Sequence, residues 1–132
     1  MLGTEKLYTA AQTRALDHCA IHEHHIPGIT LMSRAADAAF RYLLATWPAP
    51  ECLQVMCGTG NNGGDGFLIA DLAHKRGIDV TVFQLGDAGK IGGDALLARQ
   101  QALAHGVRIV PFATAALAPV GAADAKPQPK AK

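Results

Sequence analysis

The residues best suited to chemistry in this sequence lie in one short stretch that is rich in glycine and amide side chains. It reads CGTGNNGGDGFLIA from Cys57 to Ala70 and contains five glycines, two asparagines and one aspartate. Gly58, Gly60 and Gly63 match the pattern G-x-G-x-x-G between an expected strand and an expected helix, the setting of a phosphate-binding turn. Glycine permits positive φ and close approach of a ligand, and free N–H groups at a helix start favour an anion. The stretch therefore predicts a nucleotide site.

Three polar side chains add oxygen atoms to the same stretch. Asn61, Asn62 and Asp65 offer carbonyl and carboxylate oxygens, which suit either a hard cation or sugar hydroxyls. An NAD-dependent dehydrogenase carries an acid about twenty residues after its glycines, at the end of the second strand. Gln84 and Leu85 stand at that place here, so the pattern argues against a dehydrogenase. We expect a polar ligand bound through backbone and side chains together.

The elements that must position this stretch alternate between helix and strand. Thr9 and Gln12 form a capping-box pattern that begins a helix ending near His24, and a second helix is expected at about 30–46 after a Pro-Gly break. Apolar runs predict strands at 53–57, 80–85 and 107–110, with helices between them at about 65–76 and 94–105. This alternation predicts βαβ units, right-handed crossovers and a parallel sheet.

The second helix is apolar on most of its circumference, with Arg34, Asp37 and Arg41 on one polar face. We expect it to be largely buried or to contact another subunit, and we expect an ion pair between Asp37 and a neighbouring arginine. Asp94 is expected as the N-cap of the last helix.

The domain organisation follows from a change in composition near residue 112. Residues 1–112 are expected to form one domain, and residues 113–132, which are rich in alanine, proline and lysine, are expected to be a disordered tail. Three parallel strands leave open sheet edges, so the sheet is expected to be incomplete.

Composition limits the classes of partner. The chain has 132 residues, 49% of them hydrophobic, and a formal net charge of +1, which gives no argument for binding nucleic acid or an anionic membrane. No apolar run is long enough to span a membrane, and the N-terminus lacks a secretory pattern. Three cysteines without a C-x-x-C pair suit a reducing compartment, so we expect a cytoplasmic protein.

Histidines cluster near the end of the first helix. His18, His22 and His25 are spaced i, i+4 and i+7, with Cys19 beside them and the pair Glu23–His24 nearby. Two histidines at this spacing can hold zinc, but a stable site needs further ligands. No downstream cluster supplies them, so a solvated helix face is the preferred interpretation.

Two longer segments resemble a known family. The string GTGNNGGDGFLIADLAHKRGIDVTVF resembles the signature of the YjeF N-terminal domain family, the NAD(P)H-hydrate epimerases. The upstream LYTAAQTRALDHCAIHEHHIPGITLMSRAADAA is similar to the opening helix pair of that family. The resemblance runs from Leu7 to Phe112, over the first half of the family's domain, and implies a Rossmann-like three-layer α/β/α fold preceded by two N-terminal helices.

The resemblance also implies a function. Members of the family interconvert the R and S epimers of hydrated NADH and NADPH, called NADHX and NADPHX, in nicotinamide nucleotide repair, and they work beside an NAD(P)H-hydrate dehydratase. Carried over, the resemblance assigns substrate binding to five residues: Asn61, Asn62, Gly63, Gly64 and Asp65. It assigns Asn62 as a ligand of one potassium ion, and it suggests a homodimer.

One departure from the family pattern limits this reading. In the family, an Asp-containing segment leading into a second glycine loop and a later Asp-x-Pro-Ser-Gly segment together supply another potassium ligand, more substrate contacts and the catalytic aspartate. Neither segment is found between Pro111 and Lys132. The catalytic residue is therefore unassigned, and the chain is expected to be a truncated member. A non-catalytic nucleotide-binding or protein-interaction module derived from the same fold is the alternative. The intact Asn-Asn-Gly-Gly-Asp run favours the enzyme.

Overall fold

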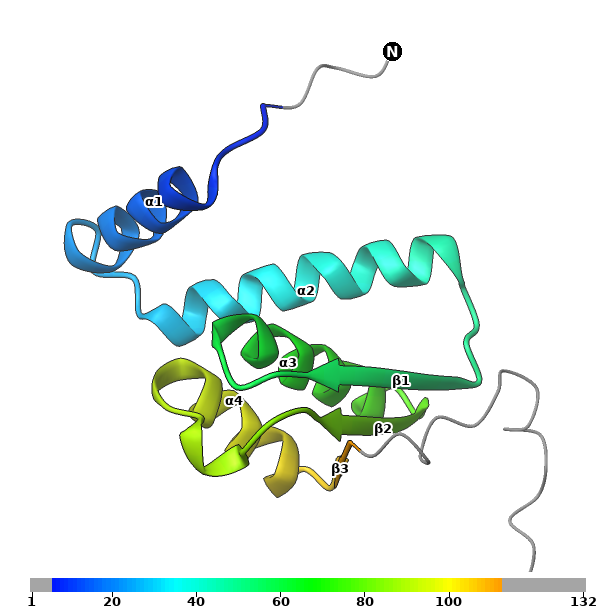
Figure 1. The fold of residues 1–132 in the computed structure, drawn as a ribbon. Helices are drawn as coiled ribbons and strands as arrows, with labels where there is room; N and C mark the ends of the chain where they lie inside the picture. The colour runs from blue at the N-terminus through cyan, green and yellow to red at the C-terminus, as the bar shows by residue number, and fades with distance from the viewer. Residues whose placement is uncertain (1–5, 113–132) are drawn as a thin grey trace, which may run out of the picture.

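The computed structural model describes residues 6–112, which form four α-helices, one short 3₁₀ turn and three strands (Figure 1). In chain order these are α1 (Ala10–His22), α2 (Gly28–Thr46), β1 (Cys52–Cys57), α3 (Asn61–Lys75), β2 (Asp79–Gln84), η1 (Ala88–Lys90), α4 (Gly93–Ala104) and β3 (Arg108–Pro111). The predicted disordered tail, residues 113–132, lies outside the described residues. Among the described residues, no helix combines the length and the apolar character that crossing a membrane requires.

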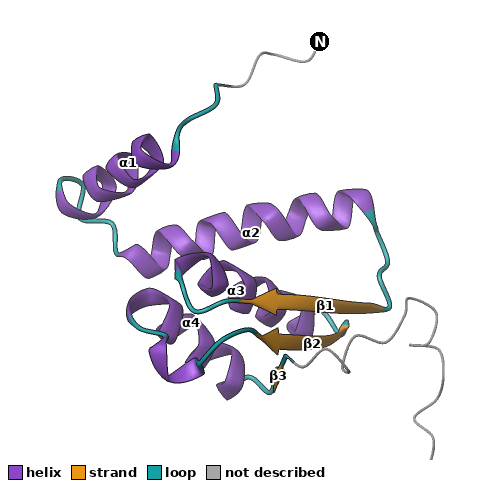
Figure 2. Ribbon diagram, viewed as in Figure 1, coloured by secondary structure: helices purple, strands orange, loops and turns teal. Residues whose placement is uncertain are grey.

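The three strands form one parallel sheet in the order β1-β2-β3. Cys52 pairs with Asp79 and Cys57 with Gln84, while Thr81 pairs with Arg108. Helices α3 and α4 lie on one side of the strands, and α2 runs along α3 (Figure 2). These observations confirm the predicted α/β fold, its parallel sheet and the two helices that precede it.

The hydrophobic core lies between the sheet and α3. Val80 and Val82 of β2 are buried there, together with Phe67 and a run of alanines on α3 and α4. Burial of Phe67 alone removes a large apolar side chain from water, which contributes about 1.5–3 kcal/mol. On the opposite face of β1 the side chain of Met56 is half exposed. The packed side of the sheet is thus the side that its connecting helices cover.

Helix α2 differs from the expectation that it is largely buried. Ala36 and Phe40 are its buried residues, and Tyr42 is 77% exposed, because the helix packs mainly against α3 and less against α4 and α1. Its polar face carries the expected ion pair, with Arg41 Nη2 2.7 Å from Asp37 Oδ2. Contact of this helix with another subunit stays a prediction.

A buried carboxylate joins α3 to α4. Asp71 is 1% exposed and accepts hydrogen bonds from Gln101 Nε2 at 2.9 Å and His105 Nδ1 at 2.8 Å. Lys75 Nζ lies 3.2 Å from the same carboxylate. Burial by itself would raise the pKa of Asp71, but the hydrogen bonds from these three partners outweigh it, so the pKa is lowered. The ionised carboxylate therefore stabilises the packing of the two helices.

This network predicts a stability that depends on pH. The folded-state pKa of Asp71 is below its unfolded value, so the stabilisation is present above the unfolded pKa and is lost as pH falls through the folded pKa. Asp71→Asn should lower the free energy of unfolding by about 1–3 kcal/mol at pH 7. Urea denaturation of both proteins should show that this difference narrows at pH 3. An equal difference at both values would contradict the assignment.

Candidate functional site

Three helices begin at the carboxyl end of the sheet. In Figure 1 the strand arrowheads point to the same side from which α2, α3 and α4 start. Their first turns lie against one another: a Cβ added to Gly64 of α3 would lie 2.6 Å from Met32 Sδ of α2 and 3.0 Å from Ala95 Cα of α4. In open α/β sheets ligands bind at this edge.

The Asn-Asn-Gly-Gly-Asp run is helical, which corrects the expected start of the helix at residue 65. Helix α3 begins at Asn61, directly after its N-cap Gly60. Glycine costs about 1 kcal/mol relative to alanine inside a helix, which made the run look like a loop. Tertiary packing of the glycines overrides that local preference. The two asparagines are exposed on the first turn, Gly63 and Gly64 are buried, and Asp65 is partly buried.

Three glycines of this stretch, Gly63, Gly64 and Gly66, allow close packing, and the positive φ that glycine permits is not used here. Residues 58–66 contain none of the positive-φ glycines, which are at positions 77, 86, 93 and 106. A Cβ on Gly63 would clash with the carbonyl oxygen of Gly58, and one on Gly66 would lie 2.6 Å from Cys57 Sγ. These glycines allow α3 to start immediately beside the end of β1.

The three converging helix starts lack side-chain caps within the described part of the chain. Their N-caps are Pro27, Gly60 and Gly92. By contrast, Thr9 and Gln12 form the full predicted capping box at α1. An uncapped first turn leaves backbone N–H groups without partners, and each helix start carries roughly half a positive charge. The carboxyl edge of the sheet therefore offers donors and positive potential to an anion.

Two carboxylates lie beside these helix starts. Asp94 is the second residue of α4, so its expected role as N-cap is wrong, and its carboxylate lies directly against Gly28 at the start of α2. The pKa of Asp65 is raised, first by burial and then by the negative charge of Asp17 on α1. An acid held in unfavourable surroundings at a ligand-binding edge is typical of a functional position.

Gln84 is a site residue whose role the sequence did not reveal. Its side chain is 6% exposed, and Nε2 donates to the carbonyl oxygens of Cys57 at 3.1 Å, Gly58 at 3.3 Å and Leu85 at 2.9 Å. Among the described residues, its Oε1 is buried without a partner. The only sequence signal was an amide at the end of an apolar strand. Gln84 fixes the backbone that leads from β1 into α3.

A separate hollow of about 500 Å³ lies at the far end of the sheet, where β1 begins. Its lining includes Leu43, Trp47 and Leu53, and it is mostly apolar. Because α3 starts at the opposite end of β1, this hollow is not part of the candidate site.

The fold and the site define a class, the open α/β domains that bind ligands where helices start at the carboxyl edge of a parallel sheet. The family model described as YjeF-related protein N-terminus matches residues 28–120, and the chain belongs to this family. It is 42% identical over 106 residues to the bifunctional NAD(P)H-hydrate repair enzyme Nnr of Coxiella burnetii, covering 80% of this chain and 22% of that enzyme. It is 42% identical over 85 residues to the NAD(P)H-hydrate epimerase of Limosilactobacillus fermentum, covering 64% and 41%.

A solved structure shares the fold. The crystal structure of yeast ynu0 matches with a TM-score of 0.71 at 18% sequence identity, over 81% of this chain and 47% of that one. This likeness confirms the expected fold class. The chain thus spans less than half the length of each of these three proteins.

The packing of α3 predicts unequal losses of stability when alanine replaces two of the glycines. Gly63→Ala should lower the free energy of unfolding by about 1–3 kcal/mol, because the new Cβ meets the Gly58 carbonyl. Gly58→Ala is the matched control, since nothing lies within 4 Å of its added Cβ, and it should change stability by less than about 0.5 kcal/mol. Urea denaturation measures both. Equal losses would contradict the packing role.

The raised pKa of Asp65 predicts a gain in stability when its charge is removed. The folded-state pKa lies above the unfolded value, so ionised Asp65 costs stability above the folded pKa, and this cost disappears below the unfolded pKa. Asp65→Asn should therefore raise the Tm at pH 7, and the gain should vanish at pH 3. Calorimetry at both pH values checks this. A lower Tm of Asp65→Asn at pH 7 would contradict this prediction, because it would show that the ionised carboxylate stabilises the fold.

Proposed function

We propose that this chain is the nucleotide-binding part of an NAD(P)H-hydrate epimerase, which interconverts the R and S epimers of hydrated NADH and NADPH in nicotinamide nucleotide repair. The observation that carries the proposal is the position of the Asn-Asn-Gly-Gly-Asp run. It forms the start of α3, which has no side-chain cap, and α2 and α4 begin beside it, also without side-chain caps. The names of the relatives support the same reaction. They also favour the enzyme over a non-catalytic module.

Each part of the run has a proposed task. The pyrophosphate of the substrate accepts hydrogen bonds from N–H groups at the helix starts, which favour anions. The exposed side chains of Asn61 and Asn62 hydrogen-bond to hydroxyl groups of the substrate. Gly63 keeps α3 close to the end of β1, and Gly64 lets α2 and α4 approach the same turn, so that the first turn of α3 faces the ligand. Asp65 receives a hydrogen bond from the bound nucleotide.

A potassium ion is part of the proposal, and its fit depends on the donors present. Asn62 exposes a neutral amide oxygen, and Asp65 adds a carboxylate one turn away, both of which suit a hard cation. The positive helix starts oppose a lone cation, but a bound pyrophosphate and the acids Asp17 and Asp65 supply compensating charge. The ion would hold substrate oxygens in place. We assign one ligand within this chain, Asn62.

The catalytic group is left unassigned, and three further expectations stay proposals. The Coxiella relative is named as a bifunctional repair enzyme, so we propose that this chain works beside an NAD(P)H-hydrate dehydratase. A homodimer and a cytoplasmic location are likewise proposed from the resemblance and the composition.

The proposal predicts selective binding of the hydrated nucleotide. Isothermal titration of the chain with NADHX, unmodified NADH and ADP-ribose should show tightest binding of NADHX, and replacing potassium by lithium should weaken it. Asn62→Ala should lower the affinity about tenfold, the loss of one good hydrogen bond or ligand.

Gln54→Ala is the matched control, because this amide is exposed on β1 away from the helix starts. It should bind as the unaltered chain does. Equal affinity of NADH and NADHX would contradict the hydrate as substrate, and unchanged binding by Asn62→Ala would remove Asn62 from the site.

A further inference from the structure

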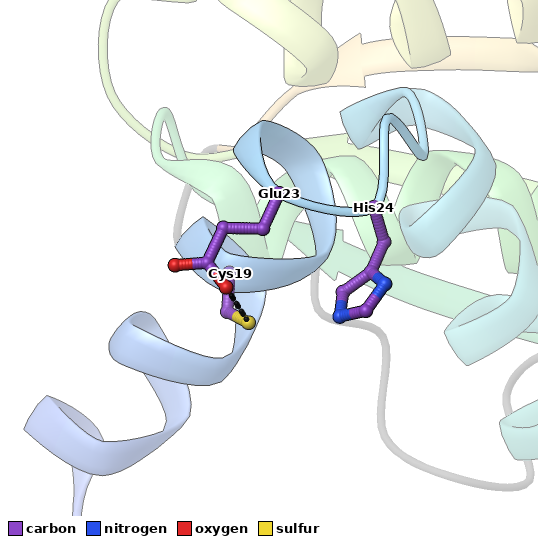
Figure 3. A group of neighbouring side chains, drawn as sticks. All are labelled: Cys19, Glu23 and His24. Carbon is purple, nitrogen blue, oxygen red and sulfur yellow. Dashed lines mark hydrogen bonds between the residues drawn. The ribbon is translucent and has the colours of Figure 1, made fainter.

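A second group of side chains able to do chemistry lies at the end of α1. The ligand atoms of Cys19, Glu23 and His24 all lie within 4.8 Å of one another (Figure 3). The thiol of Cys19 donates a hydrogen bond to Glu23 Oε2 at 3.2 Å. Cys19 is partly buried, while Glu23 and His24 are exposed, so the group is open to solvent.

The backbone at the end of α1 holds these three residues together. The N–H groups of Glu23 and His24 both donate to the carbonyl oxygen of Cys19, at 2.9 and 3.3 Å. Ile26 N–H then donates to the Ala20 carbonyl at 3.0 Å, and His25 adopts a positive φ of 55°. This ending reverses the chain tightly. It brings the imidazole of His24 back beside the thiol that lies one turn earlier.

The donor set is one that zinc prefers. Zinc binds cysteine sulfur at about 2.3 Å and histidine nitrogen or carboxylate oxygen at about 2.0–2.2 Å, so ligands of a tetrahedral site lie roughly 3.5 Å apart. The thiol and the carboxylate are already at about that separation. The imidazole of His24 lies within 4.8 Å of both ligand atoms on an exposed side chain, and zinc binding would require it to rotate closer. Three protein ligands leave one position for water.

We propose that Cys19, Glu23 and His24 form a binding site for a zinc-class divalent ion. On binding, the S–H bond of Cys19 breaks, its proton goes to solvent, and the sulfur and the Glu23 oxygen that accepted its hydrogen bond both turn to the metal. No residue of α1 is buried, so the helix gains little from packing. The metal fixes the last turn of α1 and the reversal that leads to α2.

This site differs from the histidine pair considered from the sequence. His18 and His22 stack with ring centroids 4.2 Å apart and lie outside the group. His25 is turned away from the helical path by its positive φ. The candidate ligands are therefore the sulfur of Cys19, an oxygen of Glu23 and a nitrogen of His24, not the histidine pair that the spacing indicated.

Cobalt(II) absorption of the 132-residue chain tests the proposal. One equivalent of cobalt should produce a thiolate-to-cobalt charge-transfer band and the strong visible bands of a tetrahedral site, and zinc should displace them. Cys19→Ser should abolish the charge-transfer band. His24→Ala should weaken cobalt binding more than about tenfold, since even the loss of a residue that only hydrogen-bonds to a metal ligand costs about 10–100-fold.

His18→Ala and Cys52→Ser are matched controls, a histidine of the same helix and an exposed cysteine elsewhere, and both should bind as before. Zinc should also slow amide hydrogen exchange in residues 19–26 of the unaltered chain and not of Cys19→Ser, whose fold is checked by circular dichroism. A band that survives Cys19→Ser, a band lost in His18→Ala, or no binding at all would each overturn the proposal.

Discussion

The close approach of α3 to the end of β1 is the constraint on which the rest of the structure depends. It exists because Gly63 and Gly66 have no side chains where the Gly58 carbonyl and the Cys57 thiol lie. Gly64 in turn lets α2 and α4 come close to the same turn. As a result three helices start at one edge of the sheet, and their positive ends reinforce one another. The geometry that packs the core is also the geometry on which the proposed anion site rests.

Two acids on α3, Asp71 and Asp65, have opposite pKa shifts and different roles. Asp71 is surrounded by Gln101, His105 and Lys75, and its ionised form is stabilised. Asp65 lies at the proposed binding edge, where burial and the charge of Asp17 raise its pKa and so disfavour its ionised form. The first carboxylate joins two helices. The second is held at a cost to stability, as expected of a group whose partner is a ligand.

Local signals predicted most of the architecture, and long-range packing produced the surprises. The capping box at Thr9, the three apolar strands and the parallel sheet could all be predicted, because each depends on neighbours in sequence. The start of α3 could not, since its glycines look like a loop until β1 and α4 are beside them. The same holds for Gln84, whose three acceptors come from the ends of both strands. The motif in this stretch identified the family correctly, but the packing roles of its glycines required the structure.

The central claim is that the converging starts of α2, α3 and α4 bind the nucleotide. Amide chemical shifts of the ¹⁵N-labelled chain, followed during titration with NADHX, test it most directly. The largest changes are expected at residues 28–30, 60–65 and 92–95, and they should reach saturation at the same NADHX concentration. Changes concentrated instead around Leu43 and Leu53, at the far end of the sheet, or spread evenly over the chain would contradict it.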